Sequence, residues 1–305
     1  MDGSATGWYF STMPRQVASL EPKRVAFLRT KYGRELLLDA GYVSGYRDFD
    51  QAGRPHALGF HDILLVTEGR GRFDLDDRTH AVAPGVVLFT RPGEVRRWRV
   101  AHVDGACVFF AEDFVGEAFS DPRFLDQFAY FRSDRPSGAL RLSPRHCRQY
   151  LERFDAMRRE IAALRADASH ALRAVLYELL VMLNRLYVAA YGAPARSVPN
   201  ATLERFQARV ERDFRRRHRL ADYASELGVS PGHLNTLCRT RLRRSAGAWI
   251  RARITLEAKR LLLYSDATAA QIAARLGFED PSYFARFFRR EAGESATRFR
   301  LARRG

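Results

Sequence analysis

An internal repeat in the last third of the chain limits the fold more than any other feature of the sequence. Residues 220–229 align with residues 269–278. The alignment pairs a small residue and a glycine in each copy: Ala224 with Ala273, and Gly228 with Gly277. Each copy is a short amphipathic stretch that ends at its glycine, which can adopt the left-handed conformation that a tight turn needs. A helix-starting Ser-Pro or Asp-Pro follows. The repeat predicts two helix-turn-helix units, at about 220–241 and 268–291.

The net charge of +16 is concentrated in the same part of the chain. Residues 201–305 contain 23 Arg and Lys against 11 Asp and Glu, an excess of +12, which leaves +4 for the first 200 residues. Such an excess favours a polyanionic partner, here double-stranded DNA. Residues 192–200 contain two prolines and a glycine without apolar periodicity, which is typical of a linker. We therefore predict a separate basic domain at 201–305.

The first domain, residues 1–142, has the pattern of a β-rich fold. From residue 63 onward, short apolar runs alternate with turn signals, which indicates a sandwich or a barrel. At Ser143 the apolar period becomes helical, so that residues 143–191 are expected to form two helices. The second carries leucines at alternating steps of four and three: Leu172, Leu176, Leu179, Leu183 and Leu186. This seam is typical of a helix that pairs two chains or of a helix buried in its own domain.

Three stretches of the basic domain resemble the signature of AraC/XylS-type transcription regulators: AKRLL at 258–262, IA at 272–273 and LGFEDPSYFARFFRR at 276–290. The resemblance covers about residues 200–302. It departs at two loops where the family often has Gly-x-Ser-Pro, which here read Arg243-Arg244-Ser245-Ala246 and Gly293-Glu294-Ser295-Ala296. It implies an α+β protein, with an N-terminal cupin-like β-barrel and a helical pair, then an all-α domain with two helix-turn-helix units. It also implies a homodimer that forms through residues 143–191.

The same resemblance assigns DNA contacts to the second helix of each unit. In a helix-turn-helix this helix enters the major groove, and one connecting helix, here 246–263, would present both units to segments about 34 Å apart. The expected DNA-binding residues are Gly232, Asn235, Thr236, Arg239, Arg241, Ser282, Tyr283, Arg286, Arg289 and Arg290. Asn235 could pair with adenine and Arg286 with guanine, whereas the other arginines would hold phosphates. Leu234, Leu237, Phe284 and Phe288 are expected in the core. The arginine run at 215–219 is either a phosphate clamp or a solvated helix end.

Residues 40–110 resemble the small cupin sensor domain that is common in this family. Many cupins bind a metal through clustered histidines and a third histidine after a Pro-Gly turn, but Pro92-Gly93 is followed by Glu94-Val95-Arg96-Arg97. We therefore expect no metal and no cofactor. A barrel interior can hold a small ligand. The expected effector-binding residues are His56, His61, Phe73, Phe89, Arg91 and Trp98, and Arg96, Arg97 and Arg99 are placed near the rim. This mixture suits an organic anion such as an aromatic acid, unless the arginines are solvated and the aromatic residues are core.

These observations predict a ligand-responsive, sequence-specific transcription regulator that acts by recruitment, with RNA polymerase as a further partner, and without catalysis. Two alternatives stay open: a metal-dependent cupin enzyme fused to a basic domain, and a non-specific architectural DNA-binding protein. No apolar run approaches the roughly 20 residues of a membrane span. The first residues lack the pattern of a signal peptide, and the three cysteines are far apart. We therefore predict a cytoplasmic protein.

Overall fold

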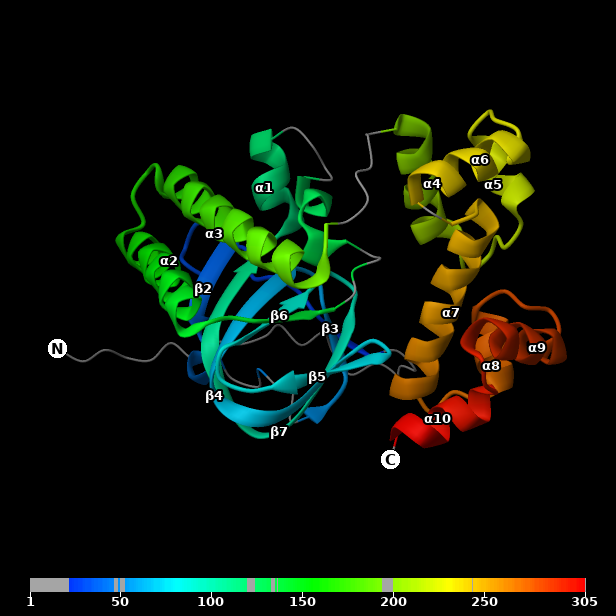
Figure 1. Ribbon diagram of the computed structural model, residues 1–305, viewed down its shortest axis with the longest axis horizontal. Coiled ribbons are helices and arrows are strands. Elements are labelled where there is room, and N and C mark those ends of the chain that lie inside the picture. Colours follow the sequence, from blue (N-terminus) through cyan, green and yellow to red (C-terminus); the bar gives the residue numbers. More distant parts are fainter. Residues whose placement is uncertain are drawn as a thin grey trace. The chain divides into compact units, whose positions relative to one another are not determined.

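The computed structural model describes residues 22–304, except 47, 48, 50–52, 120–123, 133, 134, 136, 194–199 and 243. The chain divides into two compact units near residue 194, so the greater part of the predicted linker lies outside the described residues. The predicted α+β class is observed: a sheet-rich first unit and an all-helical second unit (Figure 1).

The first unit is built around one eight-stranded sheet. Its strands are β1 (Lys23–Val25), β2 (Leu38–Tyr42), β3 (His56–Leu58), β4 (His61–Leu75), β5 (Arg78–Val82), β6 (Val86–Thr90), β7 (Val95–Phe110) and β8 (Ala139–Arg141). The order is β1-β3-β7-β4-β6-β8, with β2 also paired to β7 and β5 to β4. The long strands β4 and β7 are antiparallel, with irregular register between Val66 and Gly71, and Figure 1 shows them curling round the interior of the unit. Bulges of this kind increase the bend of a strand.

Both faces of this sheet are buried. The inner face forms one core, which includes Leu64, Phe73, Trp98, Cys107 and Phe109. The outer face packs against three α-helices and short 3-10 turns: α1 (Glu112–Phe119), α2 (Pro144–Ala163) and α3 (Ala168–Tyr191). α2 begins where the sequence predicted, because the Ser143 side chain accepts a hydrogen bond from the His146 amide and Pro144 occupies the first turn.

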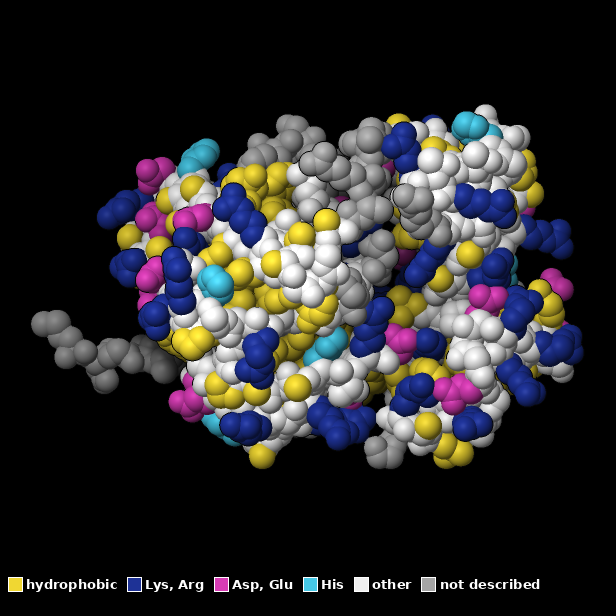
Figure 2. All heavy atoms as spheres, viewed as in Figure 1, with side chains coloured by type: hydrophobic (Ala, Val, Ile, Leu, Met, Phe, Trp, Pro, Cys, Tyr) yellow, Lys and Arg dark blue, Asp and Glu magenta, His cyan; other side chains and the backbone are white. Residues whose placement is uncertain are grey.

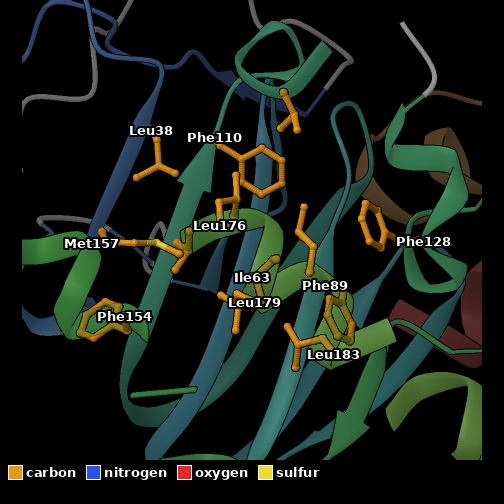
Figure 3. Packing of buried hydrophobic residues seen from close by; sticks show 14 of the residues in the cluster. Leu38, Ile63, Phe89, Phe110, Phe128, Phe154, Met157, Leu176, Leu179 and Leu183 are labelled. Carbon is orange, nitrogen blue, oxygen red and sulfur yellow. The ribbon is translucent and has the colours of Figure 1, made fainter. Parts of the chain in front are cut away.

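The leucine seam of α3 is part of the outer-face core of its own unit. Leu172, Leu176, Leu179 and Leu183 are all fully buried. Figure 3 shows three of them, Leu176, Leu179 and Leu183, among sheet residues such as Ile63 and Phe89. These four leucines are therefore not free to pair two chains, which corrects the expectation that the seam is a dimer interface. A heptad pattern fits both environments because each buries the same stripe of a helix.

α3 also differs from the expectation that no segment has the character of a membrane span. By length and composition alone, α3 is the one helix in the described part of the chain that is apolar enough to cross a membrane. It lies along the sheet of its own unit through its leucine face. One such helix is weak evidence, since the core helix of a globular domain has the same composition.

The second unit consists of seven helices in the described residues: α4 (Ala201–Asp213), α5 (Leu220–Glu226), α6 (Pro231–Leu242), α7 (Ala246–Tyr264), α8 (Ala269–Arg275), α9 (Pro281–Ala292) and α10 (Ala296–Arg304). Local capping explains several boundaries. Ser245 caps α7, Thr268 and Gln271 form a reciprocal capping box on α8, and Asp280 caps α9. Gly293 ends α9 in the left-handed conformation, with φ 80°. One apolar core joins all seven helices.

Candidate nucleic-acid interface and effector site

Two helix-turn-helix arrangements, α5–α6 and α8–α9, have the same turn geometry. Gly228 and Gly277 take φ values of 67° and 73°, respectively. In each turn, the apolar residue after the glycine donates its amide hydrogen to an alanine carbonyl five residues earlier: Val229 to Ala224 at 3.1 Å, and Phe278 to Ala273 at 2.9 Å. Both alanines are fully buried, so no side-chain bulk separates the two helices of a unit.

The outward face of α9 is suited to the major groove. Phe284, Phe287 and Phe288 anchor the helix in the core. The predicted contact residues Ser282, Tyr283, Arg286, Arg289 and Arg290 are all exposed. The Arg286 side chain is 71% exposed, and its nearest recorded carboxylate is that of Asp280, at 3.8 Å. Figure 2 shows basic side chains gathered over this helix. α9 therefore presents a guanidinium group that can reach a base edge.

The outward face of α6 carries fewer groups that could read a base. Gly232, Thr236 and Arg239 are exposed, and Arg241 is half-buried. Asn235 is half-buried, and its Oδ1 accepts a hydrogen bond from the amide of Ala246 at 3.1 Å. A bidentate contact to adenine needs that same oxygen as an acceptor. An amide oxygen has two lone pairs and can accept a second hydrogen bond, so the adenine contact of Asn235 stays a prediction, while the observed bond ties α6 to the start of α7.

His233 is a contact candidate that the sequence reasoning missed. It is exposed on the first turn of α6, and its amide is capped by the Ser230 hydroxyl at 3.1 Å. The repeat that pairs Leu234 with Phe284 also pairs His233 with Tyr283, so the signal was present in the alignment. Of the predicted core residues, Leu234, Phe284 and Phe288 are fully buried, and Leu237 is half-buried.

The arginine run at 215–219 is largely occupied within its own unit. Arg215 forms an ion pair with Glu257 at 2.5 Å, and Arg217 forms one with Glu226. Arg216 and Arg219 are exposed. Two of the four arginines therefore hold the segment in place, which fits neither a continuous phosphate clamp nor a wholly solvated helix end.

In the first unit, the predicted effector residues divide between the two faces of the sheet. His56, Phe73 and Trp98 face the interior. The Trp98 ring lies 4.5 Å from that of Phe73 and 5.6 Å from that of Phe49, an aromatic residue that the sequence reasoning did not select. His61 and Phe89 instead lie on the outer face. The His61 ring stacks on Phe110 at 5.1 Å, and Phe89 stacks on Tyr130 at 4.3 Å. Neither residue therefore faces the interior of the sheet, and Phe89 has the core position that the sequence left open as the alternative.

The arginines predicted near the rim occupy several environments. Arg91 is half-buried at the turn after β6, where its amide donates to Glu94 Oε2 at 2.8 Å. Arg97 donates to the carbonyl of Gly53 at 3.2 Å, and Arg99 donates to Asp74 at 2.7 Å. Arg96 is the exception, because it is only 2% exposed and points into the interior. No local pattern indicates this burial, since arginine is rarely buried without a partner.

Arg96 is the centre of a buried polar group inside the sheet. Its Nε donates to Nε2 of His56 at 2.8 Å, and its Nη1 donates to Oδ2 of Asp62. Because Nε2 of His56 accepts, its Nδ1 is the donor to the carbonyl of Arg54, at 3.0 Å. Burial, assisted by Arg96, lowers the pKa of His56 to about 3, so this histidine is neutral. Burial raises the pKa of Asp62 to about 6, although Arg96 opposes the change.

Two buried polar atoms on the inner face of the sheet lack a hydrogen-bond partner within the part of the chain that the structure describes: Oδ1 of Asp62 and Nε1 of Trp98. One can only accept and the other can only donate. Buried polar atoms are normally paired, so both are candidates for a ligand or an ordered water. Over the described residues, no cluster of three or more His, Cys, Asp or Glu side chains could hold a metal ion.

Sequence comparisons match both units to known families. Residues 41–180 match the AraC-like ligand-binding domain, and residues 223–302 match a helix-turn-helix domain. The transcriptional activator RhaS of Klebsiella pneumoniae is 25% identical over 243 residues, which cover 77% of this chain and 83% of that protein. The transcriptional regulator ExsA of Pseudomonas aeruginosa is 33% identical over 105 residues, which cover 34% of this chain and 38% of that protein.

Solved structures give weaker matches. The DNA-binding domain of AdpA, in complex with a target DNA, covers 34% of this chain and 93% of its own, with 24% identity and a TM-score of 0.32. ToxT from Vibrio cholerae covers 88% of this chain and 100% of its own, with 11% identity and a TM-score of 0.39.

Proposed function

We propose, from the premise that this chain belongs to the AraC family of transcription regulators, that a neutral effector bound inside the sheet controls how its two helix-turn-helix units engage DNA. The family accounts for a DNA-binding regulator with a ligand-binding domain. The interior of the sheet bears on the nature of the effector, and the contrast between α6 and α9 bears on which helix reads the DNA sequence.

The observation that carries the DNA-binding function is the pair of matching turns, each followed by a helix with an exposed outer face. Within that pair, we assign direct base contact mainly to Arg286, and phosphate contact to Arg239, Arg289 and Arg290. Gly232, Thr236, Arg241, Ser282 and Tyr283 would line the same surface. On this assignment, the α8–α9 unit would discriminate between DNA sequences more strongly than the α5–α6 unit.

The interior of the sheet supports an effector without net charge. Arg96 is already neutralised by Asp62, and both side chains are only 3% exposed. A carboxylate placed there would meet the free Oδ1 of Asp62 at close range, in surroundings where charge repulsion is strong. A hydroxyl group could donate to that oxygen and accept from Nε1 of Trp98. The rings of Phe49, Phe73 and Trp98 favour an aromatic or otherwise flat body. We therefore retain an aromatic effector but replace the predicted acid group by a hydroxyl group.

The remaining assignments follow from the family and the two units. Residues 1–142 would bind the effector, residues 143–191 would support that domain and supply part of a homodimer surface, and residues 201–305 would bind DNA across a linker at 192–200. Since Leu172 to Leu183 are buried, a dimer would use the other face of α3, where Tyr177 is 41% exposed. A regulator of this kind would work in the cytoplasm, through RNA polymerase and without catalysis.

A binding-site selection tests the DNA-binding function. The full-length protein is incubated with a randomised duplex library, and the enriched duplex is compared with a scrambled one at physiological salt. We expect a ratio of affinities of about 10³ or more, together with a steep fall in affinity as salt rises. A fragment from about residue 198 to 305 should keep both properties. Equal affinity for the two duplexes would favour a non-specific architectural protein.

Matched small molecules test the effector separately. Thermal unfolding of the full chain is measured with 4-hydroxybenzyl alcohol and with 4-hydroxybenzoate, as probes that differ in charge. The alcohol should raise the unfolding temperature more than the acid, and the difference should vanish in Trp98→Phe, which keeps a ring but loses the donor. A larger effect of the acid would contradict the neutral effector and would leave the DNA-binding result unaffected.

A further inference from the structure

Residues 214–218, which join α4 to α5, contact both helix-turn-helix units and the helix between them. Towards the first helix-turn-helix unit, α5–α6, the segment accepts a hydrogen bond: the Tyr223 hydroxyl donates to the carbonyl of Arg217 at 2.9 Å. Arg217 also pairs with Glu226, the last residue of α5. The segment is therefore fixed to the α5–α6 unit at Arg217, between Arg215 and His218, which contact the α8–α9 unit.

Glu257, near the middle of α7, binds the same segment through its carboxylate group. Its Oε1 pairs with Arg215 at 2.5 Å, and its Oε2 pairs with Arg253 at 3.1 Å and with Arg260 at 3.6 Å. The guanidinium group of Arg253 also lies 3.8 Å from the centre of the Phe214 ring. Both carboxylate oxygens are thus engaged, and the start of the segment is bound to α7 by charge and by stacking.

The electrostatic balance keeps Glu257 ionised although it is only 7% exposed. Burial alone would raise its pKa, but Arg253, Arg215 and Arg260 outweigh burial and hold that pKa at about 2. Loss of the carboxylate would leave three arginines close together without their shared partner. In some proteins, polar groups at buried positions select one arrangement rather than add net stability.

The second helix-turn-helix unit, α8–α9, contacts residues 214–218 through its turn. A Cβ atom added to Gly277 would lie 2.4 Å from the carbonyl oxygen of Arg215, so only glycine permits this approach. The ring of His218 lies 4.6 Å from that of Phe278, the residue after the glycine. Among the residues that the structure describes, the first turn has no such neighbour, since a Cβ atom added to Gly228 would meet none of their atoms within 4 Å. The segment therefore binds specifically to the turn of the second unit.

These contacts bear on the distance between the recognition helices α6 and α9. α7 has 19 residues, about 28 Å of helix, and it is the only covalent connection between the two units. Helices of this length are commonly curved. The shared apolar core holds α7 along its length, which leaves small changes in its curvature as the remaining freedom between α6 and α9. Residues 214–218 contact the middle of α7, the α5–α6 unit and the turn of the α8–α9 unit at the same time. They therefore restrict that freedom.

We propose that Glu257 and Arg215 fix the separation and rotational phase of the two recognition helices, and so act as positioning residues that determine which spacing of major-groove segments the protein accepts. Neither residue belongs to the outward faces of α6 and α9. Their contribution to specificity is therefore exerted through geometry.

Duplexes of altered spacing test the proposal. The duplex enriched by the full-length protein is resynthesised with one base pair inserted or removed between its two protected segments, which shifts them by about 3.4 Å and rotates them by about 34°. Affinities are measured by fluorescence anisotropy. We expect the wild type to lose about tenfold or more on either altered duplex. Glu257→Gln should bind the original duplex more weakly and should discriminate among the three spacings by no more than about threefold.

Two further variants make the result decisive. Arg215→Gln leaves Glu257 paired with Arg253 and Arg260, and should flatten the spacing preference in the same direction if Glu257→Gln fails to fold. Glu294→Gln removes a carboxylate that pairs with Arg303 at 2.7 Å, away from the segment, and should keep the wild-type preference. A uniform loss of affinity at all three spacings in the folded variants would overturn the proposal, as would an unchanged preference in both.

Discussion

The two helix-turn-helix units share one backbone plan but present different surfaces to DNA. Each has a buried alanine in its first helix, a glycine at positive φ in its turn, and a hydrogen bond from the next amide back to that alanine. α9 adds three buried phenylalanines on its inner face and three exposed arginines on its outer face. α6 is anchored by Leu234 and Cys238, and outward it presents Gly232 and Thr236.

The two copies therefore keep the same turn geometry while they carry different side chains on the outer face of the second helix. The turn depends on backbone geometry and on small residues, which both copies retain. The recognition face depends on side chains that contribute little to the core, so one copy can lose readers while its fold persists. Three pairs of substitutions and one single substitution test this difference between the two helix-turn-helix units, in order of decreasing expected effect.

The largest effect is expected in the two cores. Phe284→Ala should lower the free energy of unfolding by about 3–5 kcal/mol, since it removes a fully buried ring that contacts Phe278 and Phe288. The equivalent Leu234→Ala should cost about 2–5 kcal/mol, towards the lower end because a smaller side chain is lost. Urea denaturation followed by far-UV circular dichroism measures both. A larger decrease in the free energy of unfolding for Leu234→Ala than for Phe284→Ala would show that the α5–α6 unit is the better packed of the two.

The turn glycines should differ although their φ values agree. Gly228→Ala places a Cβ atom in open space, so its cost is that of a left-handed non-glycine residue, about 1–2 kcal/mol. Gly277→Ala adds a clash with the carbonyl of Arg215 and should cost more than about 2 kcal/mol. The same denaturation experiment compares them. Equal costs would mean that the segment 214–218 yields easily, which would also weaken the bracing role assigned to it.

A polar residue on each recognition helix should respond differently to removal. Arg286→Ala should leave stability nearly unchanged and weaken binding by about 1–3 kcal/mol at one base position. Asn235→Ala should cost stability, about 1 kcal/mol, through the lost bond to the Ala246 amide. Binding-site selection with each variant beside the wild type separates the outcomes. A changed base preference for Asn235→Ala would confirm its adenine contact, and an unchanged one would leave it only the bond to Ala246.

The smallest effect is expected at Gly232, the position equivalent to Ser282. An added Cβ atom would meet only the Ser230 hydroxyl, at 4.0 Å, so Gly232→Ala should fit and stabilise α6 by about 0.5–1 kcal/mol through helix propensity. DNA affinity should change little, because an alanine methyl group supplies no hydrogen bond. Thermal unfolding and anisotropy with the enriched duplex measure the two quantities. A marked loss of affinity would show that the α6 backbone approaches the DNA closely at this position.

The effector site could be predicted only in part, because its strands are buried on both faces. Residues 63–66 and 86–89 are apolar without alternation, so their pattern does not indicate which side chains point inward. The position of His61 and Phe89 on the outer face therefore does not follow from this pattern. Arg96 was placed near the rim because three arginines stand close together in β7, and only the pairing with Asp62 and His56 distinguishes it.

Local patterns were enough to predict the two turns, the basic character of residues 201–305 and their resemblance to a family, because each depends on a glycine at a fixed offset, an apolar period or a charge count. Contacts between distant residues instead decide which face of the sheet each side chain occupies, that the α3 leucines are core, that Asn235 bonds to the start of α7, and that Glu257 pairs with three arginines. Those outcomes depend on contacts between residues such as Arg215 and Gly277, which lie 62 positions apart in the chain. No local pattern encodes such a contact, since burial and pairing are decided by which surfaces meet on folding.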